Sequence, residues 1–224
     1  MLKRMSALLL TLGLTASAAQ AQSLLDKAVA HAGGEAKLKA VHQLHWTGTA
    51  TIFAKDKIEI GTSTTVHPFK DARSDTWLAT DGPTKTRSLI VEGDHGWTEM
   101  DGDRKPLPAA QARHEAAQYS LYGLMLLSPL RDPKAMITID AIKGEVAVTY
   151  PAAPPTVLVF AKDGSLKAAR NMVPAPDGKG PPIHQVIRFD GDMVSRGVHW
   201  PRHIVISQDG KLYYDLKLEQ FEVS

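Results

Sequence analysis

The chain has 224 residues, contains no cysteine, and carries 26 basic against 24 acidic side chains. The lack of cysteine excludes a disulfide framework, a thiolate metal site, a cysteine nucleophile and a lipid anchor attached through cysteine. Nearly balanced charge without a basic run argues against nucleic acid as a partner, and a hydrophobic fraction of 43% is too high for a disordered chain.

The first 21 residues have the order of a cleavable secretory signal peptide. Lys3 and Arg4 precede an apolar stretch over residues 5–14, and Ala19 and Ala21 supply the small-x-small pattern of a cleavage site. The apolar stretch is shorter than the roughly 20 residues that cross a bilayer, and a buried N-terminal helix or an uncleaved anchor is the alternative interpretation. We therefore predict a signal peptide over residues 1–21 and a freely diffusing, charge-balanced mature chain.

After the signal, the hydrophobic pattern first has a helical period. Residues 23–41 cluster their apolar side chains on one side, with Ser23 as an N-cap, and Gly33-Gly34 interrupts the segment. We expect one helix that ends near these glycines and a second short turn behind it.

From residue 44 the period changes to two, which is typical of half-buried strands. Short turns such as Gly93-Asp94, Lys143-Gly144 and Asp209-Gly210 separate the strands, which favours sequential antiparallel pairing. The pattern predicts twelve strands, at residues 44–52, 57–66, 72–79, 84–92, 95–100, 136–142, 145–150, 156–161, 166–172, 183–189, 200–207 and 212–221.

One helix interrupts the strands between Pro106 and Ser128. This region is rich in helix-forming residues, two prolines precede it, and Pro129 stops it. A single helix between two runs of strands has to lie on a face of the sheet or cross a barrel mouth. Because so large a sheet rarely stays flat, the sequence predicts a mainly β fold: one strongly curved antiparallel sheet over residues 22–224, forming a single domain.

No motif in the chain has the spacing of a catalytic or cofactor site. His114-Glu115-Ala116-Ala117-Gln118 resembles the zinc-protease motif, but its fifth residue is a poor zinc ligand, so we interpret His114 and Glu115 as solvated helix residues. A nucleophile elbow, a phosphate loop and a dinucleotide fingerprint are all missing. The sequence therefore predicts a protein that is not an enzyme and has no metal site and no cofactor.

Large aromatic residues are spread over separate elements of the first half of the chain. If the sheet curls, they line its concave face under the helix, either as a filled core or as the wall of a cavity for an apolar ligand. The candidate lining and lid residues are Trp46, Trp77, Trp97, Tyr119, Tyr122, Met125 and Leu126.

The order of these elements resembles the LolA/LolB-like superfamily of periplasmic lipoprotein carriers. The resemblance covers nearly the whole mature chain, through short motifs of low specificity. They are Gly33-Gly34-Glu35, Leu44-His45-Trp46-Thr47-Gly48, Gly96-Trp97, Leu127-Ser128-Pro129-Leu130 and Gly197-Val198-His199-Trp200-Pro201.

This resemblance implies an open half-barrel of about 11 strands, with an N-terminal helix and a central helix as a lid over an apolar cavity. It also implies a periplasmic location and an acyl chain as ligand. Two departures separate this chain from the carriers themselves. The soluble carrier holds its lid with an arginine in an early strand, and neither residues 44–53 nor 57–66 contain one. The lid segment carries Arg113, His114 and Glu115, so its first turn is polar and only its second half could face lipid. The receptor-type member is itself anchored through a cysteine, which this chain lacks.

We therefore expect a monomeric, non-enzymatic periplasmic protein that binds a lipid, a lipoprotein acyl chain or another apolar ligand. An envelope lipoprotein or a membrane protein is a candidate partner. Two alternatives stay open: an interaction or scaffold module of the cell envelope with a filled core, in which edge strands or the loop at residues 174–182 do the work, and a metal-dependent hydrolase that uses His114.

Overall fold

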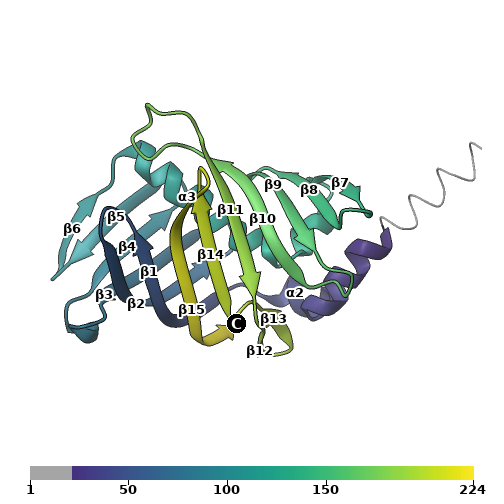
Figure 1. The fold of residues 1–224 in the computed structure, drawn as a ribbon, viewed down its shortest axis with the longest axis horizontal. Helices are drawn as coiled ribbons and strands as arrows, with labels where there is room; N and C mark the ends of the chain where they lie inside the picture. The colour runs from purple at the N-terminus through teal and green to yellow at the C-terminus, as the bar shows by residue number, and fades with distance from the viewer. Residues whose placement is uncertain (1–21) are drawn as a thin grey trace, which may run out of the picture.

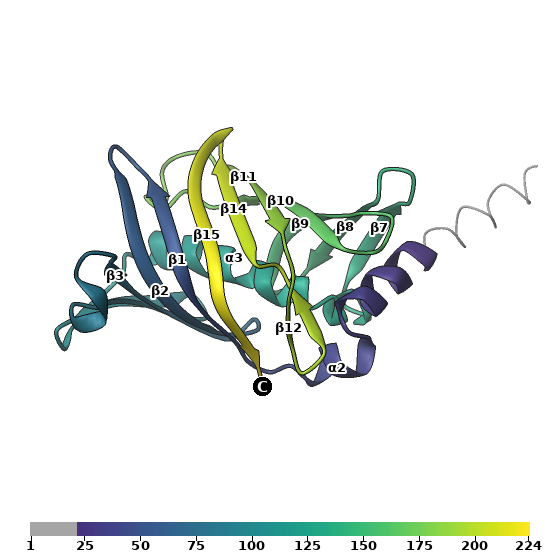
Figure 2. The same ribbon diagram turned by 60° about the horizontal axis from the view of Figure 1, so that its bottom comes forward.

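The computed structural model describes residues 22–224, which form a large curved β-sheet with a helix lying in its hollow (Figures 1 and 2). The expected signal peptide lies outside the described residues. Within residues 22–224, no helix combines the length and the apolar character needed to cross a bilayer.

Two helices precede the sheet, as the sequence predicts. The first covers residues 22–32 and the second, α2, covers Glu35–Ala40. Gly33 and Gly34 separate them with φ angles of 128° and 89°, in the region that only glycine adopts freely. A Cβ atom on Gly33 would lie 2.3 Å from the carbonyl oxygen of Gly197, so this turn also needs the absence of a side chain.

The first six strands form one wing of the sheet, each pairing antiparallel with the next. A 3-10 turn at Gly82–Thr84 separates the third strand from the fourth. The strands are β1 (Leu44–Phe53), β2 (Lys57–His67), β3 (Asp71–Leu78), β4 (Arg87–Glu92), β5 (His95–Met100) and β6 (Asp103–Pro106).

The other wing follows helix α3 (Ala109–Met125) and a 3-10 turn at Ser128–Arg131. Strands β12 and β13 form a separate two-stranded sheet beside it. The strands are β7 (Met136–Asp140), β8 (Glu145–Tyr150), β9 (Ala153–Phe160), β10 (Leu166–Val173), β11 (Ile183–Asp190), β12 (Met193–Ser195), β13 (Val198–Trp200), β14 (His203–Gln208) and β15 (Lys211–Val223).

The two wings meet where β1 pairs with β15, in the order β6-β5-β4-β3-β2-β1-β15-β14-β11-β10-β9-β8-β7. The edge strands β6 and β7 are not paired with each other, so the thirteen-stranded sheet stays open. The predicted open, curved antiparallel sheet is confirmed. It has more strands than the sequence pattern indicates, because β6 and the short strands β12 and β13 were not predicted.

Helix α3 joins the two free edges of the sheet and must therefore cross its hollow. It contacts β2, β3, β4 and β5 on one wing and β9 and β10 on the other. Figure 2 shows α3 running behind the central strands, between the two wings. The position of the helix over the concave face thus follows from the order of the strands, because α3 connects one free edge of the curved sheet to the other.

Alternate residues of each strand face this hollow. On β1, Leu44, Trp46 and Ala50 are buried in the main core. The register places Trp46 opposite Thr64 of β2, and Thr64 opposite Ser74 of β3, so these side chains share the concave face. The parity of each strand therefore decides which residues lie under α3.

Candidate functional site

A cavity of about 230 Å³ lies between α3 and the concave face. Its wall is mainly apolar and aromatic, with polar side chains from β2, β3, β4, α3 and β11. The lining residues are Trp46, Ile52, Ile60, Thr64, Ser74, Thr76, Arg87, Leu89, Glu115, Gln118, Tyr119, Leu121, Tyr122, Gln185, Ile187, Ile206, Tyr213, Tyr214 and Leu216.

Three predicted residues meet in this cavity and contact one another. The ring centroids of Trp46 and Tyr122 lie 4.9 Å apart, and those of Tyr122 and Tyr119 lie 6.2 Å apart. Both pairs have the tilted geometry that aromatic side chains favour. Burial raises the pKa of Tyr122 to about 12 and also raises the pKa of Tyr119. Trp46, Tyr119 and Tyr122 thus form an aromatic wall whose hydroxyl groups stay neutral over the physiological pH range.

The two other predicted tryptophans do not reach the cavity. Trp77 lies directly opposite Gly61, on the face of the sheet that points away from α3, and a Cβ atom on Gly61 would lie 2.2 Å from the indole ring. Trp97 pairs with Ile90 on the same outer face, where the guanidinium carbon of Arg104 sits 4.3 Å above its ring centroid. The expectation that both line the concave face is therefore corrected.

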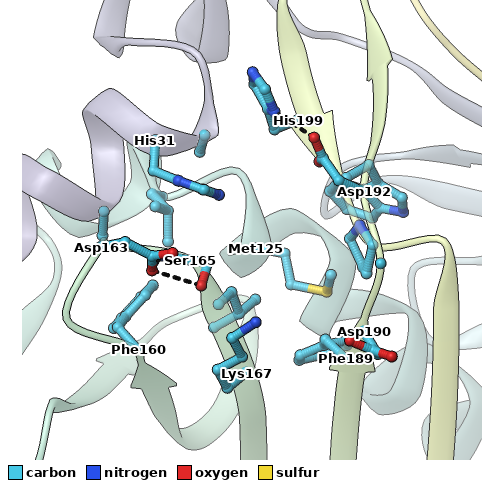
Figure 3. A pocket seen from close by; sticks show the side chains of 18 residues that line it. His31, Met125, Phe160, Asp163, Ser165, Lys167, Phe189, Asp190, Asp192 and His199 are labelled. Atoms are coloured by element: carbon cyan, nitrogen blue, oxygen red, sulfur yellow. Dashed lines mark hydrogen bonds and ion pairs between the residues drawn. The ribbon is translucent and has the colours of Figure 1, made fainter.

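The remaining two predicted residues lie at the end of α3. Leu126 is buried in the core, and Met125 is buried where it lines a second cavity of about 340 Å³ (Figure 3). This second cavity lies between the helix at residues 22–32, the β9–β10 turn and the segment from β11 to β13. Met125 therefore does not line the same space as Trp46 and Tyr122.

Polar and charged side chains surround the second cavity. His199 Nδ1 lies 2.9 Å from Asp192 Oδ2, and the hydroxyl of Ser165 donates to Asp163 over 2.7 Å (Figure 3). The ring of His31 lies 5.6 Å from that of His199. In the described part of the chain, no three histidine, aspartate or glutamate side chains are grouped so that they could hold a metal ion.

The concave face is more polar than the sequence indicates, because β2 and β3 present hydroxyl groups to it. Thr62, Thr64 and Ser74 are buried and bond to one another, with 2.8 Å between the Thr64 and Ser74 oxygens. A buried hydroxyl is stable only with such a partner. These residues satisfy one another and leave a mixed surface beneath the helix.

His114 is a buried residue, which corrects the interpretation of it as a solvated one. Its side chain is only 4% exposed, and its Nδ1 donates to the carbonyl oxygen of Pro174 over 2.6 Å. Its Nε2 accepts from Gln118 Nε2 at 2.7 Å, and Gln118 Oε1 accepts from Gln185 Nε2 at 3.3 Å. Donors and acceptors match along this chain when the imidazole is neutral, and the chain fastens α3 to the β10–β11 loop and to β11.

Glu115 faces the cavity rather than bulk solvent. Burial raises its pKa, against the opposing effects of His114 and of Arg87. Arg87 and Glu115 line the same cavity, but neither side chain forms an ion pair or a hydrogen bond among residues 22–224. The cavity therefore has a half-buried carboxyl group and, at its solvent-exposed edge, a guanidinium group that does not pair with it.

Several lining residues were not predicted, although a pattern for some of them exists. Glu115 and Gln118 lie at helical spacing from the predicted Tyr122, on one stripe of α3. Arg87 and Leu89 share strand parity on β4. The tyrosines of β15 join the cavity only because β15 pairs with β1, which no local pattern indicates.

An open antiparallel sheet with a helix across a concave, partly apolar cavity defines the class of half-barrel proteins to which this structure conforms. The sequence matches no protein-family model and no curated protein. Solved structures with the same fold include a LolA superfamily protein from Nitrosomonas europaea, with a TM-score of 0.54, 11% identity, and coverage of 91% of this chain and 93% of the other.

Two further structures agree with this assignment. A putative outer membrane lipoprotein-sorting protein domain from Vibrio parahaemolyticus gives a TM-score of 0.52 at 7% identity, covering 90% and 91% of the two chains. A DUF1329 family protein from Desulfovibrio piger gives 0.56 at 10% identity, covering 91% and 93%. The chain therefore has a LolA-like fold over nearly all of its described length.

Proposed function

We propose that this protein is a periplasmic, non-enzymatic binding protein or carrier for a lipid, a lipoprotein acyl chain or another apolar ligand. The ligand is held between α3 and the concave face, against Trp46, Tyr119 and Tyr122. The observation that carries this proposal is the cavity beneath the helix, since a filled core would leave no such space. The LolA-like fold and the expected signal peptide support a role in the cell envelope.

The size of the cavity indicates how a ligand enters. Small-molecule sites usually have volumes of about 300–1,000 Å³, whereas this cavity has about 230 Å³. A long chain therefore needs α3 to move away from the sheet. The first half of α3 is held by packing of Ala112 near Gly96 of β5 and by the hydrogen bonds of His114 and Gln118 described above.

Burial of an acyl chain supplies enough free energy for binding without a catalytic group. Each methylene removed from water contributes about 0.8 kcal/mol, so a ten-carbon segment gives about 8 kcal/mol before the entropic costs of association. Beyond its acyl chain, such a ligand needs only a few polar contacts. The cavity offers apolar surface for the acyl chain and polar side chains for the rest of the ligand.

The proposal is tested by filling the cavity. Thr76 is half-buried and lines it, so Thr76→Trp should occupy the space of the ligand. We expect delipidated wild-type protein to bind a fluorescent fatty-acid probe and the variant to bind it at least about tenfold more weakly, the loss of about 1.4 kcal/mol. Thr149→Trp, at an exposed position of β8, is the matched control and should bind like the wild type.

Two results would contradict the proposal: no probe binding by the delipidated wild type, or equal binding by the folded Thr76→Trp variant. Circular dichroism establishes folding of each variant. Mass spectrometry of protein purified from native periplasm, without delipidation, identifies the molecule that occupies the cavity.

A further inference from the structure

The cavity between α3 and the concave face has its charged side chains near one end of the helix only. Glu115 lies in its first half, and Tyr122, seven residues later, is about 10 Å further along at the rise of an α-helix. Tyr122 packs against Trp46, so that end of the cavity is aromatic. Glu115 is close enough to Tyr119 and Tyr213 for its charge to help raise the pKa of both hydroxyls, after the larger effect of burial. The cavity therefore has a charged end and an aromatic end.

Two opposite charges at the charged end have no partner. Arg87 projects from β4 and Glu115 from α3, and neither side chain is paired with the other or with another charged group of the described chain. The neighbouring amides of Gln118 and Gln185 bond to each other and so do not neutralise them. A partly buried carboxylate without a partner is unfavourable, which makes this end a site for complementary charge.

We propose that the ligand is a single-chain amphiphile with a zwitterionic head group that carries an ammonium and a phosphate. The phosphate pairs with Arg87, the ammonium pairs with Glu115, and the alkyl chain runs along α3 toward Tyr122 and Trp46. A head group with both charges uses both groups. A simple anion would leave the half-buried Glu115 carboxyl without a partner, and a simple cation would leave the exposed Arg87 guanidinium paired with solvent alone. This inference rests on the proposed function and names its ligand class.

Four probes with the same twelve-carbon chain separate the head-group charges. They are dodecylphosphocholine, dodecyl phosphate, dodecyltrimethylammonium and dodecyl maltoside, each titrated below its micelle concentration into delipidated protein and followed by calorimetry. Charge-assisted contacts distinguish the ligands, so we expect the zwitterion to bind about tenfold or more tightly than the other three.

Substitution of each charge should change this order in opposite directions. Arg87→Gln should weaken binding of the zwitterion and the phosphate and leave the ammonium probe no weaker. Glu115→Gln should weaken binding of the zwitterion and the ammonium probe and leave the phosphate no weaker. Neither should change binding of the maltoside. Arg104→Gln, on the outer face over Trp97, is the matched control and should leave all four affinities unchanged.

The outcomes separate this inference from the proposed function. If the four probes bind equally, or if either substitution leaves the zwitterion unaffected, the head-group assignment is overturned while the apolar site stands. Tightest binding of the phosphate probe alone also overturns it, in favour of a simple anionic amphiphile. If none of the probes binds, maltoside included, the proposed function fails as well.

Discussion

At the scale of single residues, the environment of Glu115 sets the chemistry of the cavity. Its carboxyl group lies between the helix and the sheet, and burial raises its pKa above the ordinary value of 4.5. The folded state therefore retains this proton at a pH where the unfolded chain has released it. Since the folded state then binds more protons than the unfolded state, this carboxyl lowers stability as the pH rises above about 4.5.

Removal of the titrating group gives a prediction with a definite sign. Glu115→Gln should be more stable than the wild type at pH 7, and its advantage should shrink as the pH falls toward 4. Urea unfolding at several pH values measures the difference in the free energy of unfolding. Glu219→Gln, at an exposed position of β15, is the control and should show no such trend. A constant difference between Glu115→Gln and the wild type across this range would contradict the assignment.

At the scale of elements, the closure of α3 depends on a few directional contacts. His114 and Gln118 connect the first half of the helix to the β10–β11 loop and to β11. Packing is more extensive in the second half, where the larger side chains of Leu121, Leu124 and Met125 are buried, than in the first half, where Ala112 is the buried apolar residue. The two halves should therefore open with different free energies.

Removal of the imidazole tests this division of the helix. His114→Ala leaves the Pro174 carbonyl and the Gln118 amide without their partner, which should cost about 1–3 kcal/mol of stability. Backbone hydrogen exchange should become faster in the first half of α3 and in residues 174–182, with little change around Leu124. Arg113→Ala, at the exposed neighbouring position, is the control. Unchanged exchange in the first half would show that these hydrogen bonds do not hold it.

Local sequence determines where the elements lie, and strand pairing determines which side chains face the hollow. The bounds of α3 and the glycine break after the first helix are local properties, so proline, glycine and hydrophobic period predict them. The side to which a strand residue points depends on register. Trp46 faces the hollow together with Ser74, and Trp77, three residues after Ser74, must face the other way. That relation requires the pairing of three strands, which no single segment determines.

The same limit explains why the polar half of the candidate site was not predicted. The pattern identifies Tyr119 and Tyr122 as one stripe of the helix. Whether Arg87 lines the cavity beside a charged helix residue depends on which part of α3 crosses above β4. His114 has the polarity of a surface residue and becomes buried only when the β10–β11 loop folds over it. Local sequence therefore predicts the elements and the aromatic wall, and long-range packing determines which charged side chains line the cavity.

At the scale of the whole molecule, the β10–β11 loop packs against the first half of α3, and under the proposed function these two segments control access to the hollow. The natural chain has no cysteine, so an engineered pair reports on this movement without interference. A Cβ atom on Gly178 would lie 2.7 Å from the Ala110 Cβ atom. Because Gly178 has a φ of 67°, which a cysteine adopts only with strain, the exposed loop must adjust its backbone to bring the pair to disulfide geometry.

The double substitution Ala110→Cys and Gly178→Cys should therefore lock the helix. We expect the oxidised protein to take up and release an alkyl-chain probe much more slowly than the reduced protein, as measured by stopped-flow fluorescence. Reduction should restore the wild-type rates, because the substitutions lie outside the cavity lining. Equal rates in both redox states would show that ligands enter without movement of this part of α3.

The junction of β1 with β15 has a consequence for the route by which the molecule is made. Leu44 pairs with Val223, so the seam that joins the two wings cannot form until both wings have been synthesised. Contacts this distant in sequence form slowly, since a long loop must close before they stabilise the chain. The hairpins within each wing join strands that are neighbours in sequence, so we expect each wing to pair before the seam between β1 and β15 closes.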